Sequence, residues 1–198
     1  TSAAQMTALG TMRVVATIPD PNATAAAGAS CLVPGPPLSY GLSLPQGWNL
    51  IGNSLDQVLS VSSLYSDSAS VTSVWKWDVG TLGWQFYTPS MDAATLQTYA
   101  SSKGYGVLST INPGDGYWVN AAAQPTLGTQ SGSSFALTLP NLAKGWNLVA
   151  TGIDLTPAEF NANLKTSLFR TDVVTLWAWD NPTSRWYFNP PLLEAQCA

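Results

Sequence analysis

The residues of this 198-residue chain that could carry chemistry are mostly carboxylates and indoles. The sequence has eleven Asp and Glu but no His, so it lacks the commonest general base and the commonest ligand of zinc, copper and iron. The carboxylates are scattered, whereas glycoside hydrolysis needs a pair at a defined separation. A serine nucleophile would have no histidine partner. We therefore expect no enzyme activity, no cofactor and no metal site.

Two aspartates, Asp78 and Asp180, occupy matching positions in two similar stretches of sequence. Each follows a Trp-x-Trp sequence and precedes an expected hairpin loop, so we interpret both as turn residues that accept hydrogen bonds from the loop backbone. The sequence Pro-Gly-Asp-Gly at 113–116 resembles part of a calcium loop. A single carboxylate makes a poor calcium site, and we predict a tight turn there.

The two cysteines, Cys31 and Cys197, lie near opposite ends of the chain and outside any metal-binding pattern. A disulfide between them would close nearly the whole chain and would stabilise it by about 4–5 kcal/mol in the loop-entropy model. We favour this disulfide because the composition is typical of a secreted protein. Two free buried thiols, or a bond to a neighbouring copy, are the alternatives.

The tryptophans belong to an internal duplication. Residues 42–89 and 137–191 each contain Leu-x-Leu-Pro, then Gly-Trp-Asn-Leu, then a Trp-x-Trp-Asp strand and a second aromatic strand. The last Trp of the first strand and the first Trp of the second are seven residues apart in both copies. Rare residues repeated at one spacing predict two tandem modules of similar structure.

Eight aromatic residues of these hairpins should share a face in groups of four, because alternate residues of a strand point the same way. They are Trp75, Trp77, Trp84 and Phe86 in the first copy and Trp177, Trp179, Trp186 and Phe188 in the second. We favour the interpretation that these rings fill the module cores, as do Trp48 and Trp146, with Lys76 and Gln85 facing solvent. The alternative is a platform on which sugar rings stack.

The expected fold is mainly β with short helices, in two related β-rich modules that follow an N-terminal arm. The expected boundaries are an arm with one strand and an extended connector over 1–40, module 1 over 41–127, a flexible Gly/Ser linker over 128–134, and module 2 over 135–198. Helices are expected over 56–65, from Ser90 to Lys103, and from Thr156 onward.

The N-terminal strand has no hairpin partner nearby. Residues 11–18 are β-branched and apolar and lie between Gly10 and Pro19, which predicts a strand. Module 2 lacks the counterpart of residues 97–120, so its sheet is expected to be unfinished. An open apolar edge promotes aggregation, and this strand is a candidate to cover it, from the same chain or a neighbouring copy. The donated residues would be Met12, Val14, Val15 and Ile18.

The charge content is low, at 9% of residues against about 25% in ordinary soluble domains. The net charge of −4 offers no basic field for nucleic acid, and no apolar run is long enough to span a membrane. A neutral polar surface is typical of extracellular β-proteins and permits close association of copies.

The order of the motifs resembles a known but uncharacterised family. Leu-x-Leu-Pro-x-Gly-Trp-Asn-Leu, Val-Trp-x-Trp-Asp, Trp-x-Phe-Tyr-x-Pro, Lys-Gly-Tyr-Gly-Val and Pro-Gly-x-Gly-Tyr-Trp-Val-Asn run through residues 42–120, and part of the series recurs over 137–193. The pattern resembles the Gly-Trp-Asn-Leu repeats of secreted bacterial surface proteins. The resemblance implies small β-rich accessory domains in tandem, each normally ending in a Gly-Tyr-Trp-Val-Asn strand, and implies no catalytic residues.

These observations predict a structural subunit of an extracellular bacterial assembly, such as a filament, sheath or surface layer. Strand addition between or within subunits would hold it together, and its partners would be copies of itself. The alternative is a carbohydrate-binding or adhesive module of a secreted surface protein, with polysaccharide as its partner. Either function places the chain outside the cell or at its surface.

Overall fold

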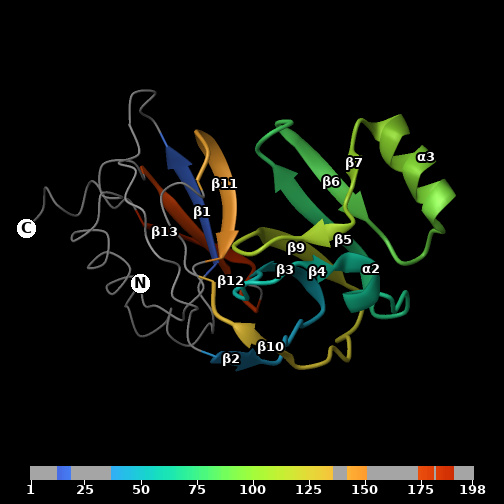
Figure 1. The fold of residues 1–198 in the computed structure, drawn as a ribbon, viewed down its shortest axis with the longest axis horizontal. Coiled ribbons are helices and arrows are strands. Elements are labelled where there is room, and N and C mark those ends of the chain that lie inside the picture. The colour runs from blue at the N-terminus through green and yellow to red at the C-terminus, as the bar shows by residue number, and fades with distance from the viewer. Residues whose placement is uncertain (1–12, 19–36, 136–141, 151–173, 181, 190–198) are drawn as a thin grey trace, which may run out of the picture.

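The computed structural model describes residues 13–18, 37–135, 142–150, 174–180 and 182–189. Within these residues the chain is mainly β with two short helices, as predicted from the sequence. Two sheets stand side by side and diverge toward the β5–β6 hairpin (Figure 1). Met12, Cys31, Cys197 and the helix expected from Thr156 lie outside the described residues.

The first sheet belongs to module 1 and has the strand order β3-β9-β5-β6-β7. Its neighbouring strands are antiparallel except for β6 and β7, which are parallel. The strands are β3 (Gly47–Gly52), β9 (Gly116–Ala121), β5 (Val71–Asp78), β6 (Gly83–Tyr87) and β7 (Gly106–Val107).

The second sheet has the order β11-β1-β12-β13, and all its described pairs are antiparallel. Its strands are β11 (Gly145–Ala150), β1 (Arg13–Ile18), β12 (Leu176–Asp180) and β13 (Arg185–Asn189). The expected N-terminal strand is therefore part of module 2. Three of the four expected donor residues, Val14, Val15 and Ile18, lie in it.

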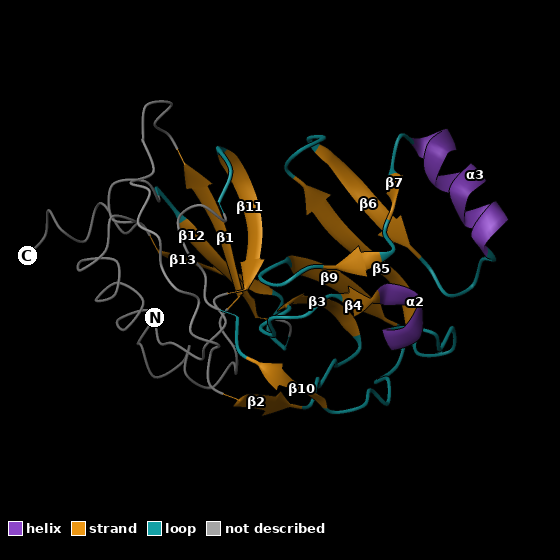
Figure 2. Cartoon of the chain, in the orientation of Figure 1, coloured by secondary structure: helices purple, strands orange, loops and turns teal. Residues whose placement is uncertain are grey.

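Smaller elements surround the first sheet, with both helices on the side away from the second sheet (Figure 2). They are β2 (Pro37–Tyr40) paired with β10 (Gln130–Ser133), β4 (Leu59–Ser60) paired with β8 (Thr110–Ile111), α2 (Val61–Leu64) and α3 (Ala93–Lys103). The helix expected over 56–65 is thus a single turn. The expected flexible linker over 128–134 contains β10, and α3 begins after Asp92 rather than Ser90.

β1 lies inside the second sheet, between two strands of module 2. Val15 is registered with Leu148 of β11 on one side and with Trp177 of β12 on the other. We expected the strand to cover an exposed edge, and this detail is wrong, because β1 is flanked by a strand on each side. The expected separate arm of residues 1–40 therefore supplies an interior strand of module 2.

The strand at the same place in the first sheet is β9. Trp118 of β9 is registered with Leu50 of β3 and with Trp75 of β5. Leu50 and Trp75 are the repeat counterparts of the two residues that flank Val15. The N-terminal strand therefore takes, in module 2, the position that the Gly-Tyr-Trp-Val-Asn strand takes in module 1.

The core of the first module is built from aliphatic side chains, three tyrosines and Phe86, not from tryptophans. Buried Val74 and Val119 lie on one face of the sheet, while Trp75 and Trp118, one residue along each strand, lie on the other. The expected tryptophan core is thus wrong for module 1. Its buried cluster is Leu44, Ile51, Leu59, Val61, Tyr65, Val71, Val74, Phe86, Tyr87, Leu96, Leu108, Ile111, Tyr117 and Val119.

Lys76 and Gln85 were expected to face solvent, and this expectation is wrong. Lys76 shares its face with the aliphatic core, is mostly buried and forms an ion pair with Asp115 at 2.6 Å. Gln85 is half-buried and donates a hydrogen bond to Asp78. Charged and polar side chains therefore lie at the ends of the core face, whereas Trp75, Trp84 and Trp118 lie on the face that is turned toward the second sheet.

Candidate functional site

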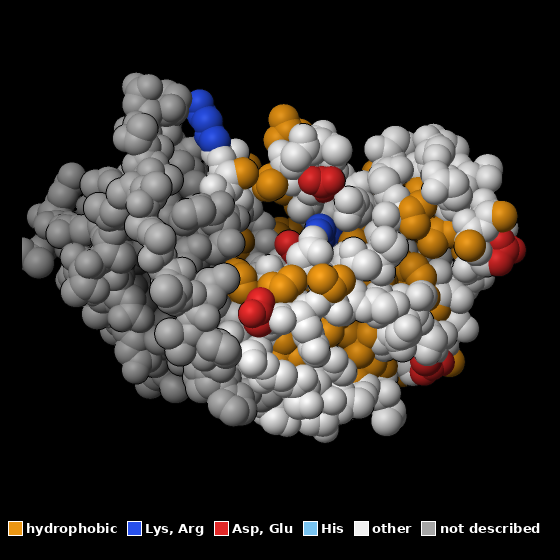
Figure 3. Space-filling view, viewed as in Figure 1, with side chains coloured by type: hydrophobic (Ala, Val, Ile, Leu, Met, Phe, Trp, Pro, Cys, Tyr) orange, Lys and Arg blue, Asp and Glu red, His pale blue; other side chains and the backbone are white. Residues whose placement is uncertain are grey.

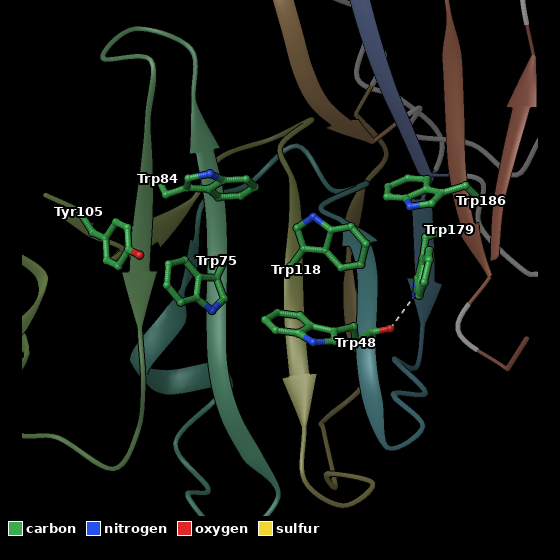
Figure 4. Close-up of a pocket in the computed structure, with 7 residues that line it drawn as sticks. All are labelled: Trp48, Trp75, Trp84, Tyr105, Trp118, Trp179 and Trp186. Atoms are coloured by element: carbon green, nitrogen blue, oxygen red, sulfur yellow. Dashed lines mark hydrogen bonds between the residues drawn. The ribbon is translucent and has the colours of Figure 1, made fainter. Parts of the chain in front are cut away.

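Aromatic side chains from both sheets surround a cleft of about 430 Å³, which we call the aromatic cleft. The surface is notched between the start of β11 and the tip of the β5–β6 hairpin (Figure 3). Seven aromatic side chains line the cleft (Figure 4). They are Trp75 of β5, Trp84 of β6 and Tyr105 before β7 on one side, Trp179 of β12 and Trp186 of β13 on the other, and Trp48 of β3 and Trp118 of β9 between them.

Trp118 is the central ring of the cleft. Its centroid lies 6.1 Å from Trp48 of its own sheet, and 5.8 Å from Trp179 and 5.7 Å from Trp186 of the second sheet. All three contacts are edge-to-face, an arrangement that aromatic pairs favour. The indole N–H of Trp179 also donates a 2.8 Å hydrogen bond to the backbone carbonyl of Trp48 (Figure 4). These contacts join the two sheets through the floor of the cleft.

The Gly-Trp-Asn motif explains how Trp48 reaches the cleft. Gly47 has a φ of 102°, which L-residues with a side chain rarely adopt, so the chain turns sharply into β3. The side chain of Asn49 donates to the carbonyls of Pro45 and Gly47 at 2.9 and 3.0 Å, which fixes this turn. Because Asn49 points into the core, the preceding Trp points to the opposite face.

The second copy of the motif uses the same device. Gly145 has a φ of 101°, and the side chain of Asn147 donates to the carbonyls of Ala143 and Gly145 at 2.7 and 3.0 Å. Both asparagines therefore cap the turn that precedes their strand. Trp146, which lies between Gly145 and Asn147, does not line the cleft.

Several rings of the cleft retain substantial exposure. The exposed fractions are 43% for Trp48, 37% for Trp84 and 45% for Trp186. Each indole therefore has apolar surface that another molecule could cover. A hydrophobic cluster left open at this size on a folded domain is typical of a ligand-binding or interaction site.

The lining of the cleft is uncharged but has hydrogen-bonding groups. Its seven lining residues are six tryptophans and Tyr105, so the lining has no carboxylate, amine or guanidinium group. In the described part of the chain, the indole N–H groups of Trp48, Trp84, Trp118 and Trp186 have no hydrogen-bond partner. These donors can bind hydroxyl or carbonyl oxygens of a neutral ligand.

The predicted aromatic residues divide into two sets. Trp75, Trp84, Trp179 and Trp186 line the cleft. Trp77 packs edge-on against Trp84 at 5.4 Å, and Trp177 lies 4.6 Å from Phe188, outside the lining. The predicted registers, with Trp opposite Trp and Trp opposite Phe in each hairpin, are confirmed.

Three residues of the cleft were not predicted as site residues. Trp48 was expected in the core with Trp146, and this is wrong for both, since Trp146 is 52% exposed. Trp118 and Tyr105 lie in the Gly-Tyr-Trp-Val-Asn and Gly-Tyr-Gly sequences, which occur only in module 1. The signal that could have found Trp118 is its register, because it lies opposite Trp75 in the sheet.

Asp78 and the turn at 113–116 take the structural roles expected for them. Asp78 accepts a 2.9 Å hydrogen bond from the Gly80 amide, which holds the pKa of this carboxyl below its usual value. Asp180 accepts from the hydroxyl of Thr183 at 2.5 Å. Asp115 accepts from the Asn112 amide at 2.8 Å and so closes the turn at 113–116.

The described residues offer no other site of comparable chemistry. They contain no group of three or more His, Cys, Asp or Glu side chains that could hold a metal ion. No helix there is long and apolar enough to cross a membrane. A second hollow of about 480 Å³ beside α2 has one aromatic lining residue, the fully buried Tyr65, so it offers no ring surface for stacking.

Comparison with known proteins identifies no relative of this chain. No family model, no curated protein and no solved structure matches this chain. The interpretation of the aromatic cleft therefore depends on the chemistry of its lining residues.

Proposed function

We propose that the chain is a carbohydrate-binding module of a secreted surface protein and that the aromatic cleft holds a neutral polysaccharide. The observation that carries the proposal is the set of seven aromatic side chains, drawn from both sheets, around a cleft of about 430 Å³. The C–H groups on one face of a pyranose ring are apolar and weakly positive, so they pack well on the negative face of an indole.

The size and polarity of the cleft support this ligand. Its volume falls within the roughly 300–1,000 Å³ of small-ligand pockets. The indole N–H donors of Trp48, Trp84, Trp118 and Trp186 could orient sugar hydroxyls, while the ring faces supply apolar contact. A purely apolar ligand would leave these donors without partners, at a cost of about 1–3 kcal/mol for each donor that became buried.

The charge of the chain favours neutral over acidic polysaccharides. The net charge is −4, and the cleft has no basic side chain that could neutralise a uronate or a sulfate. A polyanion would therefore meet long-range repulsion without a compensating ion pair. We expect binding of neutral polysaccharides to depend little on salt, because no ion pair is involved.

A second candidate function, a structural subunit of an extracellular assembly, is supported by a different observation. β1 is the first strand of the described residues, and its partners β11 and β12 come from distant parts of the chain. Strand addition of this kind can join subunits as well as close a single module. It makes no use of the aromatic cleft, so the two functions can be tested separately.

Affinity electrophoresis through gels that contain single polysaccharides tests the carbohydrate proposal. The panel should include neutral glucans, mannans, xylans and chitin derivatives, with a polyuronate for comparison. We expect retardation by at least one neutral polysaccharide and none by the polyuronate. The variant Trp84→Ala/Trp186→Ala should lose at least about tenfold in affinity, equivalent to about 1.4 kcal/mol.

The matched control is Trp146→Ala, which removes an equally exposed indole that does not line the cleft. It should bind as the unchanged protein does. Equal loss in both variants would show that exposed tryptophans act nonspecifically. Absence of retardation by every neutral polysaccharide, together with iodide quenching that added polysaccharide does not reduce, would rule the proposal out.

A further inference from the structure

β1 is an interior strand that is held by its neighbours and not by an adjoining hairpin. It is antiparallel to β11 over six registered residues, from Arg13 to Ile18, and to β12 at Val15 and Ala16. Its one connection to the rest of the described fold is the segment between residues 18 and 37. Removal of β1 would therefore break no hairpin, since β12 and β13 would stay paired with each other.

β1 lies between β11 and β12 of module 2, and we call this position the seat of β1. Without an occupant, β11 would be separated from the β12–β13 hairpin, and two strands would present unpaired N–H and C=O groups. The seat has the same register as the position of β9 in the first sheet. Any copy of β1 that reaches the seat can make the same backbone pairs, whichever chain it belongs to.

We infer that β1 is exchanged between copies of this chain, so that β1 of one copy occupies the seat between β11 and β12 of another. In the closed form β1 occupies the seat of its own chain, and in the exchanged form it occupies the seat of another copy. Both forms contain the same strand pairs, so their free energies differ mainly by the entropy of tethering β1 within one chain or between two chains. Mass action then favours the exchanged form as the protein concentration rises. A chain that both donates β1 and accepts another forms closed dimers or open polymers. The inference does not rest on carbohydrate binding.

Cysteine trapping between differently marked copies tests the exchange directly. In a full-length background with Cys31→Ser and Cys197→Ser, one preparation carries Val15→Cys and the other Leu148→Cys. These two residues are registered partners in the sheet. After mixing at rising concentrations and mild oxidation, we expect a mixed disulfide dimer whose share rises several-fold from micromolar to millimolar protein.

The control for random collisions pairs Val15→Cys with Ser131→Cys. Ser131 is exposed and lies on β10, which pairs with β2 in a separate sheet and not with β1. This pair should give only a low, random level of dimer. If the Val15→Cys and Leu148→Cys mixture gives no more dimer than the control at every concentration, the exchange is disproved. A second registered pair, Thr17→Cys and Trp146→Cys, replaces the first if either variant fails to fold by circular dichroism.

A locked chain provides an independent readout. Val15→Cys and Leu148→Cys placed together in one chain should form an internal disulfide that keeps β1 in its own seat. We expect light scattering to show association of the reduced chain at millimolar concentration and a monomer after oxidation. Equal association of the oxidised and reduced forms would overturn the inference, because association would then not need a free β1.

Discussion

The two sheets are built from copies of one repeat, yet the same residue has different surroundings in each. Phe86 of β6 is 6% exposed, because Tyr99 of α3 and Tyr105 before β7 lie 5.5 and 6.4 Å from its ring. Its counterpart Phe188 of β13 is 50% exposed, and no described residue corresponds to α3 or β7 beside it. The repeat therefore sets the strands and their register, while the elements added to each copy set which rings are buried.

The central strands differ in the same way. The first sheet has Trp118 at the position where the second sheet has Val15, so only one sheet supplies the central indole of the cleft. The indole N–H of Trp75 donates to Ser73 at 2.9 Å, whereas that of its counterpart Trp177 is buried without a partner in the described part of the chain. The cleft is thus asymmetric although the repeats are similar.

The largest effect is expected from Val15→Pro in β1. Proline removes the N–H of an interior strand and its ring obstructs pairing, so the second sheet should lose both β1 and the seat for it. Hydrogen exchange should show the amides of β11 and β12 exchanging as in an unfolded chain, while those of β5 and β9 stay protected. Val15→Ile is the control and should preserve both sheets. Unchanged protection of β11 in Val15→Pro would contradict the central position of β1.

The variants Phe86→Ala and Phe188→Ala test whether the two phenylalanines differ in burial. Removal of a buried Phe costs about 3–5 kcal/mol, and we expect Phe86→Ala to lower the free energy of unfolding by this amount. Phe188→Ala should cost less than half as much, because half of its surface is already in water. Urea denaturation of each variant measures both values. Equal costs would mean that Phe188 is covered as well as Phe86.

Gly116→Ala tests how closely the sheets must approach. A Cβ at Gly116 would lie 2.6 Å from the backbone nitrogen of Val149 in β11, so the sheets would have to move apart. We expect a destabilisation of about 1–3 kcal/mol and weaker polysaccharide binding, since the two sides of the cleft would separate. Gly128→Ala, which would meet no atom within 4 Å, is the matched control. Thermal unfolding and affinity electrophoresis measure the two effects, and wild-type values in both would refute the close contact.

The smallest effect concerns the start of α3, an element described only in module 1. Asp92 accepts a hydrogen bond from the Thr95 amide at 2.9 Å, which lowers the pKa of its carboxyl. A lowered pKa in the folded state stabilises the protein above the unfolded-state pKa near 4 and stops doing so as pH falls through the lower folded value.

The variant Asp92→Asn isolates this contribution, because Asn caps helices without ionising. The melting temperature of the unchanged protein should exceed that of Asp92→Asn at pH 7, and the difference should shrink toward pH 2. A difference that is the same at both pH values would show that the charge of Asp92 does not contribute.

Local rules account for the parts of the fold that were predicted correctly. The seven-residue Trp spacing placed both hairpins in the right register. The helix that ends at Gly104 was recognised because glycine accommodates the left-handed conformation found there. These features depend on residues a few positions apart.

The face of the sheet that forms the core could not be predicted in this way. Alternation showed that the aromatic residues share a face, but it does not say whether that face meets the core or a cleft. Trp75 and Val74 are adjacent and both apolar, so either could have been buried. The choice depends on the elements that cover each face, and these come from distant residues such as Leu44 and Leu108.

The amino-acid order thus specifies two tryptophan-rich β modules with low charge, two matching Gly-Trp-Asn turns and, at residues 11–18, a strand with no hairpin partner nearby in the sequence. The position of that strand between β11 and β12, and the meeting of tryptophans from both sheets around one cleft, arise only when the whole chain is folded. The reason is physical, because turns and registers follow from short-range geometry, whereas burial is shared among side chains that the sequence places far apart.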